Sequence, residues 1–189
     1  MLGLLEKGGD RLREAILRAT VGVVLEDAGP ILKRFAREQF NSYGYVQIRH
    51  ALKVFLSSQT DPRSVPALRE LCTKSGGPLR EYSLTALARF SDPADLPLLI
   101  ETISNTKNDV RTSTIEALTY FDDPRARDTL RRLALSASRD RLDAAIAFCQ
   151  VASDSDKARF LDESVEQEKF DVAGVVDYYL NAPPWWRSD

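Results

Sequence analysis

The chain has 189 residues, enough to bury one sizeable core, and its length does not require a second domain. Apolar residues make up 43% of the chain and charged residues 29%, a balance that excludes a disordered protein. The 26 Lys and Arg residues against 28 Asp and Glu give a net charge of −2, which does not favour a nucleic-acid-binding protein, because such proteins usually carry a basic excess.

The N-terminal segment does not resemble an export signal, because Glu6, Lys7 and Asp10 interrupt its apolar residues. No stretch reaches the roughly 18 uninterrupted apolar residues that a membrane span needs. Cys72 and Cys149 have no spacing typical of a disulfide framework or a zinc site, so we expect two buried and inert thiols. A cytoplasmic protein without membrane attachment is the prediction.

An internal repeat of 31 residues organises the sequence. Two series of residues share this register, an Asp-Pro pair and, twelve residues before each of these aspartates, an arginine that follows an aliphatic residue. The aspartates are Asp61, Asp92 and Asp123, and the arginines are Arg49, Arg80 and Arg111. Clear repeats are therefore expected at residues 46–76, 77–107 and 108–138.

Each repeat is predicted to be a helical hairpin, with a first helix before the Asp-Pro pair and a second helix after it. In the first helix small and apolar residues recur at helical spacing, for example from Val110 to Phe121. A second apolar set follows each Asp-Pro pair, as with Leu96, Leu99 and Ile103. The Asp should cap the second helix, and Pro is tolerated in its first turn because the N–H that it lacks would have no partner there.

The repeat pattern weakens toward both ends, as expected of the terminal units of a stacked array. Residues 12–45 and 139–180 are predicted to be degenerate repeats, which brings the total to about five hairpins within residues 1–182. Residues 183–189 are predicted to form a separate tail that is rich in Pro and Trp.

The order aliphatic-Arg, Ala-Leu, Asp-Pro and apolar helix resembles the short HEAT-like repeat of the bilin-lyase type. The resemblance is good over residues 48–135 and implies an all-α solenoid, a right-handed superhelix with first helices on its convex side and second helices on its concave side. It also implies that the arginine and aspartate series form a buried structural ladder between successive units. This repeat occurs in proteins of many functions, so it does not assign one by itself.

No catalytic constellation is recognisable in the sequence. His50 follows Arg49 in a first helix without a partner placed for acid–base work, so we expect a surface or half-buried residue. The chain has no G-x-S-x-G, P-loop or G-x-G-x-x-G motif, and it lacks the His-Glu pairs with which the hydroxylases of this superfamily hold iron. We expect no catalytic residue, no metal and no cofactor.

Candidate binding residues lie in the second helices. The 31-residue period aligns Arg69 with Arg131, on the side that the resemblance makes concave. Residues 125–141 hold six arginines against two aspartates, whereas residues 154–171 hold seven acidic residues against three basic ones. Arginine forks bind carboxylates well, so an acidic partner is a plausible ligand, and the alternative is a solvated face that balances the acidic segment. The predicted partner-contacting residues are Arg69, Arg127, Arg131 and Arg132.

Three functions remain open from sequence. The leading hypothesis is a non-enzymatic protein–protein interaction module, such as an adaptor, an assembly factor or an immunity-type inhibitor, that uses the concave helix face. The alternative is a bilin-lyase-like enzyme or enzyme subunit. The third is a HEAT-like alkylpurine DNA glycosylase, which should bind duplex DNA with a steep salt dependence and which the mildly acidic composition does not favour.

The tail contributes two further candidate contacts, Trp185 and Trp186, which follow a Pro-Pro pair that ends the last helix. Adjacent tryptophans either cap the final hairpin or anchor a partner. We expect a cap, so deletion of residues 183–189 should abolish the cooperative melting transition measured by circular dichroism. Unchanged melting together with loss of a complex would identify an anchor instead.

Overall fold

The computed structural model describes Ala15 and residues 44–105 and 111–181. In these residues the fold is an all-α solenoid, as predicted, with nine α-helices, one short 3₁₀ helix and no strand. The helices are α4 (Gly44–Ser57), η2 (Pro62–Ser64), α5 (Val65–Lys74), α6 (Gly77–Ala88), α7 (Leu96–Asn105), α8 (Arg111–Leu118), α9 (Pro124–Leu135), α10 (Arg141–Val151), α11 (Asp154–Glu166) and α12 (Phe170–Asn181). None of these helices is long and apolar enough to cross a membrane.

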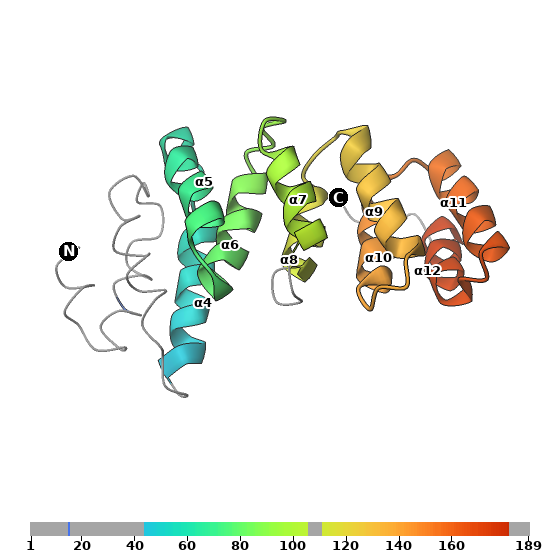
Figure 1. The fold of residues 1–189 in the computed structure, drawn as a ribbon, viewed down its shortest axis with the longest axis horizontal. Coiled ribbons are helices and arrows are strands. Elements are labelled where there is room, and N and C mark those ends of the chain that lie inside the picture. The colour runs from blue at the N-terminus through green and yellow to red at the C-terminus, as the bar shows by residue number, and fades with distance from the viewer. Residues whose placement is uncertain (1–14, 16–43, 106–110, 182–189) are drawn as a thin grey trace.

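The helices follow one another in chain order along the long axis of the molecule and form two layers (Figure 1). The first helices α4, α6, α8, α10 and α12 pack side by side in one layer. The second helices α5, α7, α9 and α11 form the other layer, and each of them packs closely on the first helix of the next unit. The strongest contacts therefore run across the boundaries between repeats and join the units into one stack.

The helical spacing predicted for the first helices matches the buried positions. In α6 the side chains of Leu79, Ser83, Ala86 and Leu87 are buried, and the equivalents of the last three one period later in α8, Thr114, Ala117 and Leu118, are buried as well. The apolar residues predicted for the second helices, such as Leu99 in α7, also belong to the core. One continuous core therefore runs between the two layers.

The predicted role of the Asp-Pro pairs is confirmed at α9, which Asp123 caps directly, whereas Asp61 caps η2 just before α5 and Asp92 bonds the turn that precedes α7. The Arg63 N–H donates to Asp61 Oδ1 at 2.9 Å, and the Arg125 N–H donates to Asp123 Oδ1 at 2.8 Å. Asp92 accepts in the same way from the Ala94 N–H at 3.0 Å. Caps of this kind each stabilise a helix by about 1 kcal/mol, so the pair fixes the start of α9 and orders the short segments that lead into α5 and α7.

The predicted arginine–aspartate ladder takes another form. The Asp61 carboxylate pairs with Arg63 and the Asp123 carboxylate pairs with Arg125, each two residues further along the chain. Among the residues described, no ion pair joins Arg80 or Arg111 to the Asp-Pro aspartates, and the side chain of Arg49 lies outside them.

Arg111 Nε instead lies 2.9 Å from Asp140 Oδ2 in the next unit, and its Nη2 donates at 3.3 Å to the Oγ of Ser138, the last residue of its own unit. Asp140 precedes α10 and is buried, with its side chain 7% exposed. Arg80 lies 3.5 Å from Thr102 Oγ1 through its Nη2. Of these two arginines, Arg111 therefore connects two units and Arg80 contacts its own unit, in both cases through partners other than those that the resemblance implies.

Both cysteines are free and buried, as predicted. Burial raises the pKa of the Cys72 thiol to about 12 and that of Cys149 to about 11. A thiol that stays protonated is a poor nucleophile, so the prediction of two inert thiols agrees with this environment.

The ends of the array lie partly outside the described residues. The predicted repeat at 12–45 falls almost entirely there, and so do Trp185 and Trp186. The predicted repeat at 139–180 contains α10, α11 and α12. Arg141 at the start of α10 pairs with Asp171 at the start of α12 at 2.6 Å, so α12 occupies the position of a further first helix in the stack.

We expect Asp140→Ala to lower the free energy of unfolding by about 3 kcal/mol, because it leaves the largely buried Arg111 guanidinium without its carboxylate. Urea unfolding followed by circular dichroism measures the loss. Arg63→Ala is the matched control, since its ion pair with Asp61 is exposed and should contribute no more than about 0.5 kcal/mol. Equal losses in the two variants would contradict a special role for the buried pair.

Candidate partner-binding surface

The arginines of α9 lie on the outer side of the second-helix layer. The helix is capped by Asp123 and buries Ala126, Leu130, Leu133 and Ala134 against the core. This packing leaves the guanidinium groups of Arg127, Arg131 and Arg132 on the opposite face, as helical spacing requires. Four of the six arginines of the predicted basic segment are therefore held on α9, whereas Arg139 lies in the turn before α10 and Arg141 at the start of α10.

Two hollows flank α9. The first, which we call the α9–α11 hollow, has a volume of about 230 Å³ and is lined by Pro124, Arg127, Asp128, Arg131, Phe148, Asp156 and Arg159. The second, the α7–α9 hollow, has a volume of about 550 Å³ and is lined by Ile100, Arg125, Asp128, Thr129, Arg131, Arg132, Leu135 and Glu163. Three of the four arginines predicted to contact a partner line these hollows.

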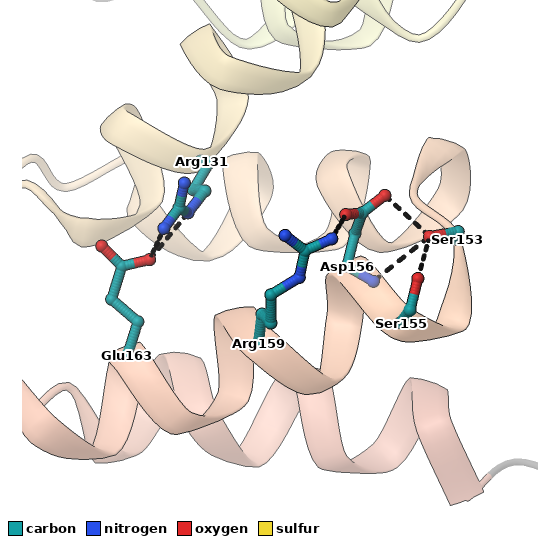
Figure 2. Close-up of polar contacts among 6 residues, drawn as sticks. All are labelled: Arg131, Ser153, Ser155, Asp156, Arg159 and Glu163. Atoms are coloured by element: carbon teal, nitrogen blue, oxygen red, sulfur yellow. Dashed lines mark hydrogen bonds and ion pairs between the residues drawn. The ribbon is translucent and has the colours of Figure 1, made fainter.

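Arg131 borders both hollows and is bound by α11. Its Nε donates to Glu163 Oε2 at 2.7 Å, and its Nη2 donates to the same oxygen (Figure 2). The pair is partly open to solvent, with the Arg131 side chain 43% exposed and that of Glu163 26% exposed. This pair links two consecutive second helices and keeps the Arg131 guanidinium in place between the hollows.

A second cluster lies at the start of α11, where the Asp156 carboxylate accepts from Arg159 Nη2 at 2.7 Å (Figure 2). Ser153 caps the helix by accepting from the Asp156 N–H, and the Ser153 hydroxyl donates to Asp156 Oδ2. The Ser153 hydrogen bond, with the charges of Arg159 and Arg127, lowers the pKa of Asp156. The carboxylate is therefore charged at neutral pH and opposes the arginines that face the α9–α11 hollow.

The remaining arginines of α9 differ in how firmly they are paired. Arg127 Nη1 lies 2.8 Å from Asp122 Oδ1, but the Asp122 side chain is 99% exposed, so this pair is weak. Arg132 is exposed and has no ion pair to any of the described residues. Arg132 is thus the α9 guanidinium most available to an incoming carboxylate.

Arg69, the fourth predicted contact, lies elsewhere and is engaged. Its Nε donates to Asp95 Oδ1 at 2.6 Å and its Nη2 to Asp92 Oδ2 at 2.7 Å, which ties α5 to the turn before α7. Asp95 is buried, with a side chain 5% exposed. Arg69 lines neither hollow. Its observed contacts connect the unit of α5 to the unit of α7.

Several residues of the surface were not predicted from sequence. Arg159, Asp156 and Glu163 belong to residues 154–171, which entered the prediction only through their net acidic charge, and Phe148 was not singled out. The period itself could have located Glu163, because it lies 31 residues after the predicted contact Arg132 and lines the same hollow. His50, the one histidine, is exposed on α4. The described residues contain no group of three or more His, Cys, Asp or Glu side chains that could hold a metal ion.

Comparison with known proteins identifies the repeat. Residues 65–149 match the family model for HEAT repeats, a range that begins with α5 and ends within α10. The match confirms the HEAT-like repeat, whereas the bilin-lyase subtype stays a prediction. No curated protein matches the chain. HEAT repeats commonly mediate protein–protein interaction through stacked helices that expose an extended surface.

The cap of α9 yields a prediction about pH. The hydrogen bonds from the Arg125 side chain, followed by the bond from its backbone N–H, lower the pKa of Asp123 from 3.8 to about 2. The stability that the charged carboxylate contributes is complete above about pH 4 and is lost as the pH falls through about 2. Arg125→Ala should raise the pKa of Asp123 toward its ordinary value, measured by NMR titration of the carboxyl carbon. Arg132→Ala, on the same helix, should leave it unchanged, and equal titration curves would contradict the assignment.

Proposed function

We propose that this HEAT-like repeat protein is a non-enzymatic protein-binding module, acting as an adaptor, an assembly factor or an inhibitor, whose partner lies against the second helices α7, α9 and α11. The single observation that carries the proposal is the pair of adjoining hollows beside α9, rimmed by arginines. The resemblance places this layer on the concave side of the solenoid. A partner would therefore contact several consecutive units at once.

The composition of the hollows suits a protein ligand. Each hollow combines charged rims with apolar residues, Phe148 and Pro124 in the α9–α11 hollow and Ile100 and Leu135 in the α7–α9 hollow. Protein interfaces gain most of their affinity from a few anchoring residues that fill pockets, with arginine and aromatic residues enriched among them. The hollows offer room for such anchors beside arginines that fix their orientation.

The surface is also held rigidly. Core packing fixes the α9 backbone, and Glu163 holds the Arg131 side chain. Ordering a long side chain at an interface costs about 0.5–1.5 kcal/mol, and a side chain that is already held avoids much of that cost. Because the backbone and the Arg131 side chain are already ordered, this surface loses less conformational entropy when a partner binds.

A photo-crosslinking amino acid in place of Asp128 tests the proposal, because Asp128 is exposed and lines both hollows. The full chain carrying this substitution is expressed in its native host, irradiated and analysed by mass spectrometry. We expect one or a few proteins to be cross-linked specifically through position 128.

Glu116 provides the matched control, since it is an exposed acidic residue on α8, in the first-helix layer. The same photo-crosslinking residue at position 116 should not capture the protein captured at position 128. Capture of that protein only from position 116 would place the partner on the other layer and contradict the proposal.

A further inference from the structure

We infer that the partner presents an acidic, amphipathic peptide segment to the two hollows, and that one of its carboxylates replaces Glu163 on Arg131. This inference rests on the proposed function and specifies the chemistry of the partner. It depends on three features of the described residues: the excess of arginine around the hollows, the weakness of the ion pairs that now hold those arginines, and the apolar residues between them.

Arginines outnumber carboxylates around the hollows. The lining carboxylates are Asp128, Asp156 and Glu163, and the lining arginines are Arg125, Arg127, Arg131, Arg132 and Arg159. This local excess contrasts with the net charge of −2 of the whole chain. An acidic segment is therefore attracted to this part of the surface, although the chain as a whole carries a small negative charge.

The arginines can change partners at little cost. The pairs formed by Arg127 and Arg159 include side chains that are largely open to water, and such pairs contribute at most about 1 kcal/mol each. Arg132 has no ion pair to displace among the described residues. An incoming carboxylate thus gains two or three charge-assisted hydrogen bonds while breaking only weak ones.

Glu163 acts in this arrangement as an internal competitor. It projects from α11 into the α7–α9 hollow and places one carboxylate oxygen on both donors of Arg131. A partner carboxylate would reproduce these two bonds, so the exchange conserves the number of ion pairs. Glu163 would then be displaced toward solvent, to which it is already 26% exposed.

The hollows favour a peptide over a nucleic acid. Their carboxylates, two of which line each hollow, oppose a continuous row of phosphates, whereas a peptide can place its acidic residues opposite the arginines only. Their apolar residues, Phe148 and Ile100 among them, fit aliphatic side chains spaced between those acids. The expected ligand is therefore a helical or extended segment that alternates acidic and apolar residues.

The test uses the full chain and a synthetic probe, an acetylated and amidated peptide that carries Glu and Leu at helical spacing. We expect NMR shifts in α9 and α11 on titration with this peptide. Replacing both Arg132 and Arg159 with Glu should weaken binding about tenfold. Arg63→Glu is the matched control, because Arg63 is an exposed arginine paired with a nearby aspartate, as Arg159 is, and it should bind like the natural chain.

Glu163→Gln provides the test of competition. It removes the internal carboxylate from Arg131 and should tighten binding of the Glu-Leu peptide about threefold, with an unchanged melting temperature to show that the fold is kept. Unchanged or weaker binding would contradict the proposal that a carboxylate of the partner replaces Glu163 on Arg131.

Two comparison ligands test the chemistry of the partner. A peptide with Gln in place of Glu should not bind, and neither should oligothymidylate. Equal binding of the Gln peptide, or binding of oligothymidylate in place of the Glu-Leu peptide, would contradict the proposal that the partner presents an acidic peptide segment. Specific cross-linking through position 128 does not depend on the charge of the partner. It would therefore support the proposed function even if the peptide experiments contradicted an acidic partner.

Discussion

The structure depends on the packing of each second helix against the first helix of the following unit. The helices α5 and α6, for example, bury Leu68, Leu71, Leu84 and Leu87 completely. Burial of such side chains contributes about 1.5–3 kcal/mol each, more than any of the surface ion pairs. A single hairpin cannot bury both of its apolar faces, so each unit needs its neighbour. This requirement fixes the spacing of the second helices, and with it the positions of the hollows between them.

Polar contacts between units are added to this apolar stack. Arg69, Arg111, Arg131 and Arg141 each reach a carboxylate that lies roughly one repeat further along the chain. Their carboxylates differ in burial, from Asp95 at 5% exposure to Asp171 at 37%. A buried carboxylate holds its arginine firmly, whereas an exposed one can be exchanged. An arginine–carboxylate pair between units therefore stabilises the stack where the carboxylate is buried, and can exchange its carboxylate for another where the pair is exposed.

The parts of the structure that could be predicted from sequence are those that many residues determine together. The period, the caps of Asp61 and Asp123 and the buried positions of both helices follow from apolar spacing and turn chemistry, which tertiary packing then reinforces. Ion-pair partners could not be predicted in the same way, because a long arginine side chain has several carboxylates within reach and the energies differ by less than about 1 kcal/mol. Asp61 accordingly pairs with the adjacent Arg63 and not with a member of the arginine series.

The two sequence interpretations of the basic segment, a docking surface and a solvated face balanced by acidic residues, are compatible in three dimensions. The acidic helix α11 neutralises Arg131 through Glu163, but the exposed Arg132 has no such carboxylate among the described residues. Partial neutralisation holds one guanidinium in place and weakens attraction to any generic anion. A single carboxylate on a ligand would only replace the Arg131–Glu163 pair with an equivalent one. Net binding energy therefore requires further carboxylates at the right spacing, together with apolar side chains that fill the hollows. Internal competition of this kind raises specificity at some cost in affinity, because a ligand is selected for its spacing of charged and apolar groups as well as for its charge.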